Sequence, residues 1–157
     1  MARPSIIWFR RDLRLNDLPT LLSATEAADE VLALFVLDDA LLRPSGARRR
    51  DFLMGCLRAL DRDLGGQLLV VEGDPVTLVP QVAAEFDATA VHISSDHGPY
   101  GTRRDRAVAE ALGDVPLVAT GSPYAVTPGR VTKPDGSAYK VFSAFRRAWN
   151  DHGWHSP

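Results

Sequence analysis

The sequence has 157 residues, the size of one ordinary domain, which excludes a multidomain assembly for this chain. Apolar residues make up 45% and charged residues 24%, which disfavours disorder and coiled-coil structure. A formal net charge of −2 argues against a free-standing nucleic-acid-binding protein.

Short apolar runs, rich in β-branched residues, alternate with stretches of helical spacing along the chain. We predict strands at residues 5–9, 31–37, 68–72, 90–94 and 116–119. This alternation is typical of right-handed βαβ units. It predicts an α/β fold with a doubly wound, five-stranded parallel sheet in the order 3-2-1-4-5, a Rossmann-like three-layer sandwich.

Helical spacing predicts four helices between these strands, at residues 19–27, 47–64, 76–86 and 102–112. Asp17 and Asp74 precede two of them and are predicted N-caps. Glycines follow two others and are typical of helix ends.

Beyond Ala119, three turn signals within sixteen residues predict a loop, and helical spacing returns at residues 141–150. Five of the twelve aromatic residues lie in the last nineteen positions. Either this helix docks on the sheet, or its aromatic residues meet a partner or further chain. We therefore divide the chain into an α/β domain, 1–130, and a C-terminal loop and helix, 131–157.

Cys56 is the single cysteine and cannot form an internal disulfide, and four scattered histidines encode no multidentate Cys/His metal site. No charged leader precedes a long apolar region, and no apolar run approaches the roughly 18 residues that span a bilayer. The expected location is the cytoplasm, without a membrane partner.

Ligands of such sheets bind at the carboxyl ends of the strands, where the strand order reverses. The first strand is followed there by an arginine-rich loop, residues 10–17, in which Asp12 and Asp17 could pair with Arg10 or Arg14. In the same arrangement Arg11 faces a carboxylate, phosphate or enolate oxygen of a ligand.

Gly98-Pro99-Tyr100-Gly101 leads into the helix predicted after the fourth strand. Its backbone N–H groups could meet an anionic or carbonyl group, and Tyr100 offers a face for stacking; a plain connecting turn is the alternative. The pair Asp38-Asp39 suits a metal ion or loop caps.

Catalytic equipment is sparse in this sequence. It contains no G-x-G-x-x-G, no Walker loop and no G-x-S-x-G elbow. His92 is predicted to be a packed core residue, and His97 beside Asp96 is a candidate acid or base. We assign no catalytic residue and do not expect a self-contained enzyme.

Four blocks of sequence carry a resemblance to a known family. They are WFRRDLRLND at 8–17, LFVLD at 34–38, DHGPYGTRRD at 96–105, and YKVFSAF at 139–145 with Trp149. In this order they resemble the DNA photolyase and cryptochrome family, and the match covers nearly the whole chain.

The resemblance implies that this chain corresponds to the front third of such a protein. A larger helical domain, absent here, would hold the catalytic FAD and the DNA-binding groove, and residues 139–157 would lead to it. The complete protein would be a blue-light-driven deoxyribodipyrimidine photolyase that splits pyrimidine dimers in damaged DNA. The alternatives are a cryptochrome-type photoreceptor and a stand-alone nucleotide-binding module.

The family's α/β domain often carries an antenna pigment, either 8-hydroxy-5-deazaflavin in the sheet's own cleft or methenyltetrahydrofolate in the groove between the two domains. By resemblance, the residues at the deazaflavin cleft are Arg11, Val36, Leu37, Asp38, Asp96 and Tyr100, and Tyr100 and Gly101 fall where folate-type members make polar contacts. The sequence departs from the family at Gly98 and Gly101, where deazaflavin and folate binders respectively tend to have Glu. It also has Ser143-Ala144 in place of Thr-Pro.

Overall fold

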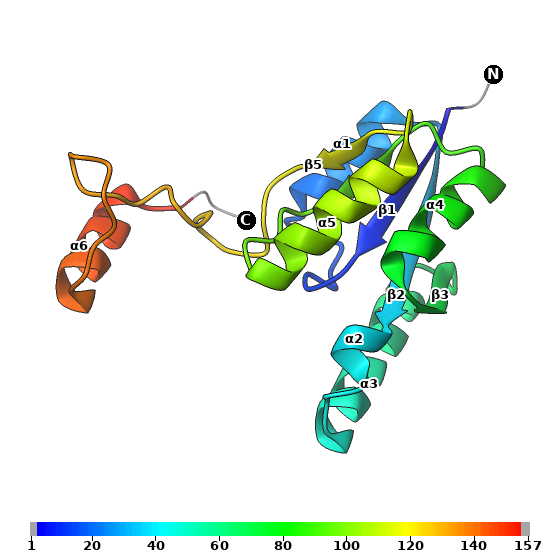
Figure 1. The fold of residues 1–157 in the computed structure, drawn as a ribbon, viewed down its shortest axis with the longest axis horizontal. Helices are drawn as coiled ribbons and strands as arrows, with labels where there is room; N and C mark the ends of the chain where they lie inside the picture. Colours follow the sequence, from blue (N-terminus) through cyan, green and yellow to red (C-terminus); the bar gives the residue numbers. More distant parts are fainter. Residues whose placement is uncertain (1–2, 155–157) are drawn as a thin grey trace.

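A computed structural model describes residues 3–154 of the chain and shows a five-stranded parallel sheet in the order β3-β2-β1-β4-β5. The strands are β1 (Pro4–Phe9), β2 (Glu30–Asp38), β3 (Leu68–Gly73), β4 (Val91–Ile93) and β5 (Leu117–Ala119). The predicted fold class and strand order are confirmed, and every strand boundary lies within a residue of its prediction. Figure 1 shows the sheet with its flanking helices.

β1 is the central strand and pairs with a neighbour on each side. Ile6 lies opposite Leu32 of β2 and Val91 of β4. Because all these pairings are parallel, the carboxyl ends of β1, β2 and β4 meet at one edge of the sheet. The arginine-rich loop, Asp38 and the Tyr100 turn therefore lie at the same edge.

Helices cover both faces of the sheet. On one face α4 (Pro75–Glu85) and α5 (Pro99–Leu112) pack on alternate residues of the central strands, including Ile6, Leu34 and Val36. On the other, α1 (Pro19–Ala27) and α3 (Ala47–Asp63) pack on Ile7, Ala33 and Phe35. This double coverage explains why β1 and the middle of β2 are continuous apolar runs rather than alternating ones.

The helices differ from the sequence prediction in three places: the N-cap of α1, the start of α5, and one additional short helix. Asp74 caps α4 as predicted and accepts the Val76 N–H at 3.0 Å. The predicted cap Asp17 is wrong: Leu18 occupies the N-cap position of α1, and Asp17 adopts a left-handed conformation with φ of 50°. α5 begins at Pro99, three residues early, because proline suits the first turn of a helix.

The third difference is α2 (Asp39–Leu42), a one-turn helix that the sequence analysis did not predict. It is capped by Asp38, whose Oδ1 accepts the Ala40 N–H at 2.9 Å. Of the two interpretations of Asp38-Asp39, the capping one is confirmed for Asp38.

The C-terminal helix α6 (Phe142–His152) stands apart from the sheet in Figure 1. None of its residues is buried, and Phe142 is 75% exposed. Two of its aromatic residues contact aromatic residues that flank the helix: the Trp149 ring stacks on Trp154 at 4.6 Å, and the Phe145 ring lies 6.3 Å from Tyr139, between ring centroids. The interpretation that this helix docks on the sheet is therefore wrong.

Among residues 3–154, no helix is long and apolar enough to cross a membrane.

Candidate functional site

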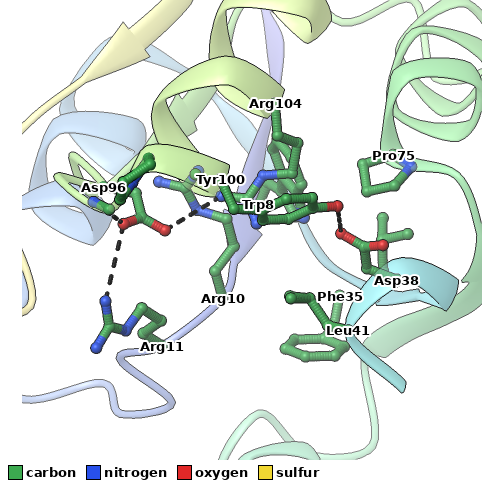
Figure 2. A pocket seen from close by; sticks show the side chains of 14 residues that line it. Trp8, Arg10, Arg11, Phe35, Asp38, Leu41, Pro75, Asp96, Tyr100 and Arg104 are labelled. Carbon is green, nitrogen blue, oxygen red and sulfur yellow. Dashed lines mark hydrogen bonds and ion pairs between the residues drawn. The ribbon is translucent and has the colours of Figure 1, made fainter. Parts of the chain in front are cut away.

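A cavity of about 370 Å³ opens where the carboxyl ends of β1 and β2 face the start of α5. Its apolar walls include Trp8, Phe35 and Leu41, and its polar groups come from all three segments (Figure 2). The volume lies within the usual range of small-molecule sites, about 300–1,000 Å³.

Asp38 and Tyr100 close one side of the cavity. The Tyr100 hydroxyl donates to Asp38 Oδ2 at 2.5 Å, while Asp38 Oδ1 caps α2. Burial and the bond to Asp38 raise the pKa of Tyr100 to about 12, so the phenol stays protonated at neutral pH. This contact joins the end of β2 to the start of α5.

Arg10 is buried and held by α5 rather than by its own loop. Its Nη1 donates to Asp105 Oδ1 at 2.5 Å, and its Nη2 donates to the Ser94 carbonyl. Burial lowers the pKa of Arg10 from its ordinary value, although Asp105 acts in the opposite direction. Sequence proximity suggested Asp12 or Asp17 as the partner of Arg10, and that interpretation is wrong.

The remaining loop residues find other partners. Asp12 is buried and accepts the Ser94 hydroxyl, which ties the loop after β1 to the end of β4. Arg14 donates to the backbone carbonyls of Asn16 and Asp17 at 3.1 and 3.0 Å, so it stabilises its own loop.

Arg11 is the loop arginine that remains available to a ligand. Its side chain is 56% exposed and lines the cavity. It lies 3.8 Å from Asp96 Oδ1 and donates to the Tyr124 hydroxyl at 3.2 Å, which are weak constraints for a guanidinium. That Arg11 faces a ligand stays a prediction; the structure places its side chain at the cavity.

Asp96 organises the start of α5. Its Oδ1 accepts the Gly98 N–H at 3.0 Å, and its Oδ2 lies 3.5 Å from Arg104 Nη2. The carboxylate passes so close to Gly101 that a Cβ there would lie 2.1 Å from it. Glycine at this position therefore makes room for Asp96.

The two histidines singled out from the sequence lie outside this cavity. His92 is buried in β4, where its Nδ1 is 3.2 Å from the Ser23 hydroxyl, so its prediction as a core residue is confirmed. His97 is exposed, and its ring lies 6.4 Å from that of Tyr124.

The structure brings six of the seven predicted site residues to the cavity. They are Arg11, Val36, Asp38, Asp96, Tyr100 and Gly101. Leu37 is not among the lining residues; strand alternation turns it away from Val36 and Asp38, and it packs on the α1 and α3 side of the sheet.

Sequence reasoning missed Trp8, Arg10, Leu41 and Arg104 as lining residues. Arg104 carried a usable signal, because it follows Tyr100 by four positions on a helix and must share its face. Leu41 lies on α2, which had no periodic pattern to reveal it.

A second, larger cavity of about 910 Å³ adjoins the first. The two share Arg10, Arg11, Phe35 and Leu41, and the second extends along α3 past Phe52 and Cys56. A ligand ring in the first cavity therefore has space for a substituent beyond it.

Residues 5–157 match the family model described as DNA photolyase. The chain belongs to the DNA photolyase family. It corresponds to the N-terminal α/β domain of the photolyase and cryptochrome proteins, as the resemblance implied, and the match covers nearly the whole sequence.

Named relatives include both branches of the photolyase family. A deoxyribodipyrimidine photo-lyase of Streptomyces griseus is 39% identical over 158 residues, which is 95% of this chain and 35% of that protein. Cryptochrome-1 of Spalax judaei is 36% identical over 113 residues, 69% of this chain and 19% of that protein. The chain thus spans about a third of the length of the photolyase relative, and less of the cryptochrome.

Solved structures agree with this assignment. The chain matches a bacterial class III photolyase from Agrobacterium tumefaciens with a TM-score of 0.84 and 28% identity, over 94% of this chain and 32% of that one. An archaeal photolyase from Sulfolobus tokodaii, solved with two FAD molecules, shares the fold with a TM-score of 0.81 and 22% identity, over 98% of this chain and 36% of that one.

Proposed function

We propose that this chain is the antenna domain of a DNA photolyase, and that the cavity beside Tyr100 holds a planar pigment of the deazaflavin or flavin class. The observation that carries the proposal is the cavity itself. It lies at the strand-order switch, has aromatic and aliphatic walls, and presents a small set of fixed polar groups.

Each polar residue has a role in this proposal. Arg11 donates to an oxygen of the pigment, and Asp38 and Tyr100 fix the other side of the ring through their mutual hydrogen bond. Asp96 and Gly101 shape the start of α5, while Val36 forms part of the apolar wall. The bound pigment supplies absorption of blue light and transfer of that energy, so the residues hold the ring and exclude water without moving a proton.

The shape of the site favours a deazaflavin over methenyltetrahydrofolate. In the family the folate lies between domains, and folate binders tend to carry a glutamate where Gly101 stands here. Any side chain at position 101 would overlap Asp96. The 8-hydroxy-5-deazaflavin is therefore the pigment we propose for the cleft, although Gly98 replaces the glutamate that its binders share.

In the complete protein, we propose that residues 131–157 lead from the α/β unit of residues 1–130 to a helical FAD domain. The exposed aromatic residues of α6 support such a contact. There, reduced FAD would donate an electron to a pyrimidine dimer flipped out of damaged DNA. We place this protein in the cytoplasm, where a single free cysteine is usual.

Equilibrium titration of the purified chain with 8-hydroxy-5-deazariboflavin, methenyltetrahydrofolate and ATP tests the antenna assignment. The deazaflavin should bind most tightly, and Arg11→Ala or Asp38→Ala should each weaken binding by about 1–3 kcal/mol. Arg14→Ala and Asp39→Ala are matched controls, because these neighbours do not line the cavity. Preferential ATP binding would instead indicate a stand-alone nucleotide-binding module.

A cryptochrome-type photoreceptor is the second candidate, because cryptochromes are among the relatives. Illumination of dimer-containing DNA in the presence of the complete protein that we propose, with its FAD domain, separates the two. Loss of dimers with fully reduced FAD supports a photolyase, and intact dimers support a photoreceptor.

A further inference from the structure

Two guanidinium groups are held over one buried indole at the base of the cleft. Trp8 lines the cavity and is only 2% exposed. The Cζ atom of Arg10 lies 5.0 Å from the centroid of its ring, and that of Arg104 lies 5.1 Å away. Both distances are within the range of cation–π contacts, about 6 Å, and Figure 2 shows the three side chains grouped beside Tyr100.

The positions of these two cations are fixed by ion pairs. Both guanidiniums contact Asp105 Oδ1, at 2.5 Å for Arg10 and 2.9 Å for Arg104, and Arg104 also lies 3.5 Å from Asp96. Both arginine side chains are less than a tenth exposed. The carboxylates offset the charge of the cluster as a whole, but the guanidiniums are the members that lie over the ring.

The indole nitrogen of Trp8 is buried without a hydrogen-bond partner in the described part of the chain. An indole that loses an electron becomes a radical cation, and it relaxes to a neutral radical only by giving its N–H proton to an acceptor. The surroundings of Trp8 provide no such acceptor within the described chain.

Indole is among the side chains most easily oxidised, and Trp8 lines the cavity that we assign to a pigment. One electron passing from Trp8 to the excited pigment would leave an indole radical cation and a pigment radical anion, and the excitation would be lost when the electron returned. A positive charge about 5 Å from the ring raises the free energy of the radical cation. The missing proton acceptor closes the route by which that cation could be stabilised.

We propose that Arg10 and Arg104 suppress electron donation from Trp8, so that a pigment excited in the cleft keeps its energy for transfer. The two arginines are positioning and tuning residues that act through Trp8. This inference rests on the proposed function, since it assumes a light-absorbing ligand in the cavity.

The first test measures the fluorescence lifetime of bound 8-hydroxy-5-deazariboflavin at saturating concentration. The double variant Arg10→Gln with Asp105→Asn removes one cation together with the carboxylate that Arg10 shares with Arg104, and it should shorten the lifetime about fivefold. Adding Trp8→Phe should restore the lifetime. In Asp105→Asn alone, Arg10 keeps its hydrogen bond to the Ser94 carbonyl and Arg104 keeps its ion pair with Asp96, so the lifetime should not shorten.

Two results of this measurement would overturn the proposal. One is an unchanged lifetime in the double variant with pigment bound. The other is a shortened lifetime that persists when Trp8 is replaced by Phe, because Trp8 would then not be the electron donor.

The second test needs no pigment and separates this inference from the proposed function. With Trp149→Phe and Trp154→Phe, Trp8 is the sole indole of the chain. Ultraviolet photoionisation then moves one electron from Trp8 to water, and transient absorption measures the yield of the indole radical cation. The yield should rise about twofold or more when Arg10→Gln and Asp105→Asn are added. Equal yields would refute the role of the guanidiniums even if the pigment binds; failure of the pigment to bind would refute only the proposed function.

Discussion

Gly101 and Gly98 lie three positions apart at the start of α5 but differ in the space available to a side chain. A Cβ at Gly101 would lie 2.1 Å from the Asp96 carboxylate, whereas one at Gly98 would lie 3.4 Å from it, an ordinary contact. The two glycines therefore form a matched pair for testing how tightly the cleft is built.

We expect Gly101→Ala to displace Asp96 and break its ion pairs with Arg11 and Arg104. The free energy of unfolding should fall by about 1–3 kcal/mol, and deazaflavin binding should weaken. Gly98→Ala should leave both close to wild type. Urea denaturation and equilibrium titration measure the two effects, and similar losses in both variants would contradict this account of position 101.

The Tyr100–Asp38 hydrogen bond predicts a dependence of stability on alkaline pH. Burial and this bond raise the pKa of Tyr100 to about 12 from its ordinary value of 10.0, so the folded state holds the phenol proton more tightly than the unfolded state does. The resulting stabilisation is fully present below about pH 10 and is lost as the pH rises towards 12.

Titration of tyrosinate absorbance should show one component with a pKa of about 12, and Tyr100→Phe should remove this late component. Asp38→Asn should move this component to lower pH, because it removes the negative charge beside the phenol. Asp39→Asn, one residue away, should leave it in place; a late component that survives in Tyr100→Phe would assign the shift to another tyrosine.

At the scale of elements, the exposed aromatic face of α6 contrasts with the buried core of the sheet. Phe142 is 75% exposed, while Leu34 of β2 is fully buried. Leu34→Ala should lower the free energy of unfolding by about 2–5 kcal/mol, because it leaves a cavity in the core. Phe142→Ala should change it little in this chain, and a large loss would show that α6 packs on the sheet after all. Chemical denaturation of both variants compares them directly.

The elements themselves were largely predictable from sequence, because periodicity and caps are local signals. The strands, the face of α3 formed by Leu57 and Leu60, and the Asp74 cap follow from neighbouring residues alone. The short α2 was missed because four residues carry no period. The N-cap of α1 was assigned to the wrong residue. Aspartate is statistically preferred at the N-cap position, but Asp17 adopts a left-handed backbone conformation here and Leu18 occupies that position.

The site was predictable only in part, for a physical reason. Strand order places the correct loops together, which is why Arg11, Asp38 and Tyr100 meet as expected. Pairing between distant charges follows from packing instead: Arg10 finds Asp105, 95 residues away, rather than the aspartates of its own loop. No local pattern distinguishes those partners.

At the scale of the molecule, the burial of His92 in β4 makes the free energy of unfolding depend on pH in the acidic range. It is 2% exposed, and burial lowers its pKa from the ordinary value of 6.5. The unfolded chain therefore takes up this proton first, so the stabilisation is present in full above about pH 6.5 and is lost as the pH falls below it.

The free energy of unfolding should begin to decrease below about pH 6.5, before carboxylates titrate near pH 4. His92→Gln should remove this early decrease, and His97→Gln, an exposed histidine, should retain it. Urea unfolding at a series of pH values checks both variants, and an early decrease that is unchanged in His92→Gln would exclude His92 as its source.

The 95-residue separation between Arg10 and Asp105 also governs when the cleft can form during protein synthesis. The first strand leaves the ribosome early, but Arg10, which directly follows it, lacks its counter-ion Asp105 until α5 has been translated and has emerged. Until then the growing chain has only part of the binding walls, and parallel pairing of such distant segments is intrinsically slow. Under the proposed function, capture of a pigment in the cleft would therefore be a late event in the maturation of the nascent chain.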